Sequence, residues 1–172
     1  QLMTGSVLFH IGVLAIFGGH FVGLLTPVVV WDTLGVTHSA KQMLAIVAGG
    51  VAGAFALVGG LLLLHRRLMD PRVRANSSFA DTAILVMLMA QLLLGLATIP
   101  ISLTHRDGHE MMKFMNWAQG VFTLRPGVAD LVADVHWIFK AHLTLGLTIL
   151  LVFPRSEEHT SELQSRQYLA CR

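Results

Sequence analysis

The stretch LFHIGVLAIFGGHFVG, residues 8–23, is an apolar segment that nevertheless carries two histidines, His10 and His20. It lies inside a run from Val7 to Val30 that contains no Asp, Glu, Lys or Arg. Because a bilayer core requires about 20 mainly apolar residues per helical crossing, this run is predicted to span a membrane. An ionisable side chain inside a bilayer costs roughly 2–3 kcal/mol or more, so the two histidines are candidates for a functional site.

The whole chain is too apolar for a soluble domain of its length. It has 172 residues, of which 54% are hydrophobic and 13% charged, and its mean hydropathy is +0.67. Four stretches are long and apolar enough to span, at residues 6–30, 43–64, 80–103 and 135–154. Since the ten-residue alternation of a membrane β-barrel is missing, we predict an all-α integral membrane helical bundle with four spanning helices. We expect the lipid bilayer as its surroundings and no nucleic-acid partner.

The connections between these segments differ in charge. The loop HRRLMDPRVRANSS holds four arginines, at positions 66, 67, 72 and 74, against one acid, Asp70, so it is predicted to be cytoplasmic. The connections after the first and third spans then face the other compartment. One of them contains HEMMKFMNWAQGVF, residues 109–122, whose Met, Phe and Trp among sparse charges predict an interfacial helix across the outer mouth of the bundle.

The histidines within the predicted spans are His10, His20 and His142. Zinc sites usually add Cys, Asp or Glu, but the spans hold almost no carboxylates, and the single cysteine, Cys171, excludes a cysteine-held cluster. Haem requires only axial ligands and an apolar slot, so haem b matches best. Ten residues separate His10 and His20 by about 15 Å along a helix, which leaves room for two macrocycles at different depths. The remaining six histidines are expected to be ordinary: His38, His65, His105, His109, His136 and His159.

Lys41 lies at the outer start of the second predicted span, at a depth close to that of His20. One interpretation is an interfacial lysine whose ammonium group snorkels to water. The other is a donor to a quinone oxygen beside the outer haem. Spacing alone does not decide between them.

Several segments, taken in order, carry a resemblance to a known family. They are His10, His20, the loop with Lys41, and then LLLLHRRLMDPRVRA, LGLATIPIS, DGHEMMKFMNWAQ and IFKAHLTLGLTILLVFP. Over about residues 2–154 the chain resembles the gamma subunit of respiratory nitrate reductase, a cytochrome b membrane anchor. The resemblance implies five spans, of which we expect the first to be missing here, so that residues 1–154 form a fragment of a dihaem domain.

The same resemblance implies a function and a location. By this resemblance we expect quinol to be oxidised at the outer face of a bacterial or archaeal cytoplasmic membrane. We expect electrons to pass through two b haems to an iron–sulfur beta subunit and a molybdenum alpha subunit. The alternatives are a haem b anchor of a related sulfur-compound reductase and a structural membrane anchor without haem.

Individual residues receive roles by matching positions in the family. His20 and His142 resemble the two ligands of the outer haem, His10 resembles one ligand of the inner haem, and Lys41 matches the lysine of the quinol site. The second inner ligand of the family falls eighteen residues after His142, at Thr160. We therefore expect the inner haem to lack that ligand in this sequence.

The segment RSEEHTSELQSRQYLACR, residues 155–172, breaks every pattern before it, because it is polar and lacks amphipathic periodicity. It closely resembles the conceptual translation of a sequencing-library adapter. We predict a non-native tail, in place of a native continuation of the fourth helix with a histidine at position 160. Resequencing the source DNA past codon 154 tests this, and recovery of the same eighteen residues from an independent library would contradict it.

Overall fold

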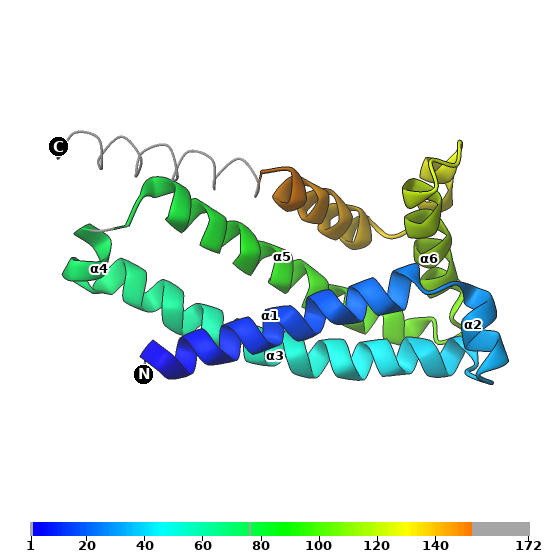
Figure 1. The fold of residues 1–172 in the computed structure, drawn as a ribbon, viewed down its shortest axis with the longest axis horizontal. Coiled ribbons are helices and arrows are strands. Elements are labelled where there is room, and N and C mark those ends of the chain that lie inside the picture. Colours follow the sequence, from blue (N-terminus) through cyan, green and yellow to red (C-terminus); the bar gives the residue numbers. More distant parts are fainter. Residues whose placement is uncertain (1, 76, 153–172) are drawn as a thin grey trace, which may run out of the picture.

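The computed structural model describes residues 2–75 and 77–152, and within them it forms helices and no strands (Figure 1). The three long helices alternate in direction along the chain, and the last described helix runs back beside the third of them (Figure 1). The elements are α1 (Leu2–Leu25), α2 (Val28–Thr33), α3 (His38–Met69), α4 (Pro71–Ala75), α5 (Phe79–Thr104), α6 (His109–Phe122), the 3₁₀ helix η1 (Val128–Val132) and the helix Trp137–Val152.

The predicted membrane helical bundle is confirmed, and the chain is a multi-pass membrane protein. In the described part of the chain three helices are long and apolar enough to cross a bilayer, namely Met3–Leu25, His38–Met69 and Phe79–Thr104. The fourth apolar helix, Trp137–Val152, is shorter. Many large apolar side chains point outward, among them Leu14, Phe17 and Phe21. Lipid tails are the natural neighbours of such a surface.

Several predicted boundaries differ from the structure: α1 begins at Leu2 and not at residue 6, and α3 covers His38–Met69 and not residues 43–64. The first span does not reach Val30, because α1 ends at Leu25 and the chain turns before Pro27, whose fixed φ and missing N–H stop the helix. Residues 28–33 form the separate helix α2. The fourth apolar helix begins at Trp137 and not at residue 135. The predictions for residues 155–172, including position 160, lie outside the described residues.

The closest helix packing is between α1 and α3, and small residues make it possible. A Cβ atom at Gly12 would lie 2.6 Å from the backbone nitrogen of Ala56 and 2.7 Å from the backbone oxygen of Ala52. A Cβ at Gly59 would meet the backbone of Phe9 in the same way. Since helices in lipid associate through close van der Waals contact, these glycines set the distance between α1 and α3.

We expect Gly12→Ala to destabilise the bundle by at least about 1 kcal/mol, because the new methyl group meets backbone atoms that cannot move aside. Gly49→Ala is the matched control, since a Cβ there meets nothing within 4 Å. The measurement is the melting temperature of the detergent-solubilised protein. Equal melting temperatures for the two variants would contradict the tight packing at Gly12.

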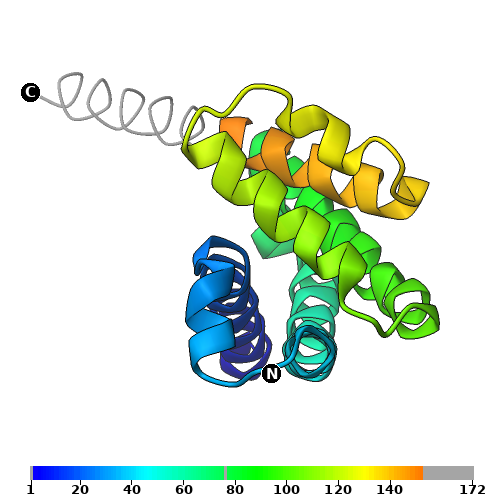
Figure 2. The same ribbon diagram turned by 90° about the vertical axis from the view of Figure 1, so that its right-hand side faces the viewer.

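At one end of the bundle α6 crosses the long helices, as the view in Figure 2 shows. The helix predicted for residues 109–122 is therefore confirmed. Two side-chain amides join α6 and α3 to their neighbours: the half-buried Gln119 side chain donates to the carbonyls of Leu24 (3.0 Å) and Thr26 (3.2 Å). The Gln42 side chain donates to the carbonyls of Ser102 and His105, both at 2.8 Å. These carbonyls at the ends of α1 and α5 have no acceptor role inside their helices, so the amides replace water there.

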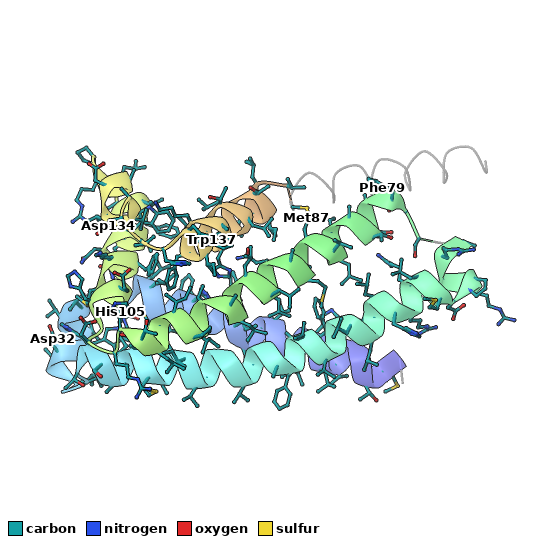
Figure 3. The ribbon with its side chains drawn as sticks, turned by 180° about the vertical axis from the view of Figure 1, so that it is seen from behind. Asp32, Phe79, Met87, His105, Asp134 and Trp137 are labelled. Atoms are coloured by element: carbon teal, nitrogen blue, oxygen red, sulfur yellow. The ribbon has the colours of Figure 1, made fainter. Side chains whose placement is uncertain are left out.

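The two ends of the bundle differ in their charged residues and in the elements that form them. Figure 3 labels Asp32, His105 and Asp134 at the end that holds α2 and α6, whereas Phe79 lies at the far end. The loop arginines belong to that far end, around α4. The charge asymmetry of the loops is thus an asymmetry of the folded molecule.

Candidate functional site

Two of the three predicted iron ligands meet in space. His20 lies on α1 and His142 lies on the helix Trp137–Val152, 122 positions later in the sequence. Their ring centres are 6.2 Å apart, and the ring planes are inclined by 43°. The fold therefore brings together the pair that the resemblance assigned to one haem.

Hydrogen bonds orient both rings in the same manner. His20 donates from Nδ1 to the carbonyl of Ile16 at 2.8 Å, and His142 donates from Nδ1 to the carbonyl of Gln91 at 3.2 Å. Nδ1 must then carry the proton in each ring, which leaves the lone pair on Nε2. A backbone carbonyl on the far nitrogen is the usual support of a metal-ligating histidine.

The two rings lie close enough for His20 and His142 together to hold one metal-containing group. Within the described residues no group of three or more His, Cys, Asp or Glu side chains could hold a metal. Two imidazoles without further side-chain ligands suit a haem iron, whose remaining ligands come from the porphyrin.

There is open space next to His20 on its own helix. A Cβ atom at Gly18, Gly19 or Gly23 would meet nothing within 4 Å. His20 itself is exposed, and His142 is partly exposed. A flat group bound between the rings would find room along this part of α1.

His10 is placed differently. Its Nδ1 donates to the carbonyl of Ser6 at 2.7 Å, so its Nε2 also keeps the lone pair. Its ring is exposed and contacts the edge of Phe9. Among the described residues no second histidine ring faces His10 as His142 faces His20. Its assignment to the inner haem stays a prediction.

The Lys41 side chain turns into the bundle and not outward. The residue is only 4% exposed, although it lies near the start of α3. Its ammonium group donates to the carbonyl of Gly23 at 2.8 Å, contacts the sulfur of Met115, and lies 4.7 Å from the ring centre of Trp31. One buried cation is therefore surrounded by residues of α1, α2, α3 and α6. Its acceptor Gly23 follows His20 on α1 by about one helical turn.

Several residues of the site were not found from the sequence. Trp31 and Met115 lie in connections between spans, and no local sequence pattern relates them to Lys41.

Gln91 was detectable from the sequence, because an amide in the middle of an apolar span is costly without a partner. Its side-chain nitrogen is 3.5 Å from Nε2 of His142, and a Cβ at Gly95 would lie 3.0 Å from Cε1 of the same ring.

Lys113 and Asp134 belong to a charged cluster that helps to line a groove of about 390 Å³ between α6 and η1. Lys113 donates to Asp134 at 2.9 Å and to Glu110 at 3.2 Å. These bonds lower the pKa of Asp134 and raise the pKa of Lys113. The cluster ties α6 to the segment that leads into the last described helix.

This cluster predicts a pH dependence. A carboxyl with a lowered pKa contributes stability above its usual pKa of about 4, and this stability disappears as the pH falls through the lower folded value. The raised pKa of Lys113 acts only near pH 10 and above. The difference in melting temperature between the parent protein and Lys113→Met should therefore stay constant from about pH 5 to 8 and shrink below about pH 4. A change between pH 5 and 8 would contradict the assignment of the pH dependence to Asp134.

Comparisons with known proteins give the family of the chain. The model of the family described as nitrate reductase gamma subunit matches residues 1–157. The chain is similar to the respiratory nitrate reductase 1 gamma chain of Escherichia coli, with 50% identity over 88% of this chain and 67% of the relative. The respiratory nitrate reductase 2 gamma chain of the same organism is 48% identical over 89% and 67%. The nitrate reductase gamma chain of Bacillus subtilis is 33% identical over 90% and 69%.

Proposed function

The chain belongs to the nitrate reductase gamma subunit family, and on this premise we propose that it oxidises quinol and carries haem b in a respiratory nitrate reductase. The observation that carries the proposal is the pair of His20 and His142, with ring centres 6.2 Å apart and with the Nδ1 of each ring donating to a backbone carbonyl. His10 would be a ligand of a second haem. Haem bound to these residues supplies one-electron redox chemistry, which a polypeptide of these side chains lacks.

Lys41 is the candidate for binding the quinol. Its ammonium group has three N–H donors, of which Gly23 and Met115 engage two. The third is left for a quinol oxygen. The indole N–H of Trp31, whose ring lies under the same ammonium group, is buried and has no partner among the described residues. Two donors without acceptors beside each other favour a ligand that presents oxygen.

The oxidation itself removes two electrons and two protons from the quinol and leaves a quinone. A hydrogen bond from Lys41 Nζ to a quinol oxygen strengthens as that oxygen loses its proton and becomes negative. Lys41 thereby favours deprotonation and holds the ring near His20. The burial of the ammonium group keeps water from competing for this bond.

The orientation follows from the charge of the two ends. The arginine-rich loop would lie in the cytoplasm, and the end with Lys41, α2 and α6 would face the outer side. Protons are then released outside a bacterial or archaeal inner membrane. Electrons leave toward an iron–sulfur beta subunit and a molybdenum alpha subunit, which would bind at the arginine end and reduce nitrate.

The test is a visible spectrum of the purified complex that contains this chain. We expect b-type bands on reduction with a quinol, and their disappearance when nitrate is added. Absence of these bands in the reduced protein would contradict the proposal and favour a structural anchor without haem. Bands that a quinol reduces but nitrate leaves unchanged would assign the chain to a different reductase.

A further inference from the structure

We propose that Gly95 and the main-chain carbonyl of Gln91, both on α5, form a notch that orients His142 as an iron ligand. The inference rests on the proposed function, in which His142 binds haem. It assigns to α5 a part in the redox site although this helix supplies no ligand. Gly95 and Gln91 are positioning residues, because they act through the imidazole.

The first observation is the close approach of the His142 ring to Gly95, which has no side chain. A Cβ atom there would lie 3.0 Å from Cε1 of His142, 3.5 Å from Nδ1 and 3.7 Å from Nε2. The edge of the ring that joins the two nitrogens therefore packs against the backbone of α5. A side chain at this position would require the imidazole to shift by a few tenths of an ångström.

The second observation is the hydrogen bond that the notch allows. The carbonyl of Gln91 accepts the N–H of His142 Nδ1 at 3.2 Å. In an α-helix this carbonyl also accepts the backbone N–H of the residue four positions on, which is Gly95. The missing side chain and the accepting carbonyl therefore belong to the same turn of α5.

The two observations together define the tautomer and the position of the His142 ring. The bond at Nδ1 selects the tautomer with the lone pair on Nε2, and the contact at Gly95 sets how far the ring stands from α5. His20 differs, since its Nδ1 donates to Ile16 within its own helix. The fold thus orients one ring locally and the other through a neighbouring helix.

The experiment compares Gly95→Ala with Gly49→Ala in the assembled reductase complex, with His142→Ala as the reference for a lost ligand. A Cβ at Gly49 meets nothing within 4 Å, so that variant controls for the added methyl group. The readouts are haem per protein, the electron paramagnetic resonance spectrum of the oxidised haems and their midpoint potentials. None of these depends on turnover.

We expect Gly95→Ala to shift or remove the resonance signal and to change the midpoint potential of the haem that His142→Ala removes. Gly49→Ala should leave both unchanged. Signals and potentials of Gly95→Ala that superimpose on those of the parent protein would overturn the inference, provided that His142→Ala has lost its haem. If His142→Ala instead keeps every haem, the proposed function fails as well.

Discussion

Replacing His142 by alanine should remove one haem from the complex and abolish quinol oxidation. His142 supplies one of only two side-chain bonds to the iron in the proposed site, and its Nε2 is aligned by the bond from Nδ1 to Gln91. His20→Ala should have the same effect, because its ring is the partner at 6.2 Å. The measurement is haem per protein by the pyridine haemochrome assay, together with the rate of quinol oxidation.

His105→Ala is the matched control for these variants. This side chain is exposed at the end of α5 and contacts Thr104, so its removal should leave the haem content unchanged. A full complement of haem in either His20→Ala or His142→Ala would contradict the pairing of these two residues. Loss of haem in all three variants would indicate general misfolding.

Lys41→Met should lower quinol oxidation by about ten- to a hundredfold while the haem content stays the same. A charge-assisted hydrogen bond to the quinol is worth roughly 1.5–3 kcal/mol, which corresponds to that range. Methionine retains most of the apolar length of the side chain, so the packing against Trp31 is disturbed less than by alanine. The measurement is the steady-state rate with a quinol donor, alongside the haem count.

Lys140→Met is the control, since Lys140 is exposed and donates to the carbonyl of Ala133. Unchanged kinetics in Lys41→Met would leave Lys41 with a structural part only, as the cation that joins α1, α2 and α6. A lower haem content would point the same way, because it would show that the ammonium group supports the bundle and not the substrate.

The local sequence was sufficient for the elements of this fold. Long apolar runs without charges define membrane helices because an unpaired backbone group or charge in lipid is costly. The apolar helices are consequences of this one constraint, whereas the unequal charge of the loops is a separate signal in the sequence. Boundaries were less certain, since an apolar residue suits either a span or an interfacial turn. Pro27 therefore ended α1 within a stretch that composition alone assigned to the span.

The site depended on contacts between segments far apart in the chain. Nothing near His142 in the sequence indicates that its ring packs on Gly95. Nothing near Lys41 indicates that Gly23, Trp31 and Met115 enclose its ammonium group.

The sequence by itself determined which segments lie in the membrane and which side chains are able to bind iron. Only the tertiary structure decided which of those side chains meet, because the meeting depends on how closely α1 and α3 approach at Gly12 and on where α5 leaves a notch. Such distances arise from the packing of whole helices and are not encoded by any single segment.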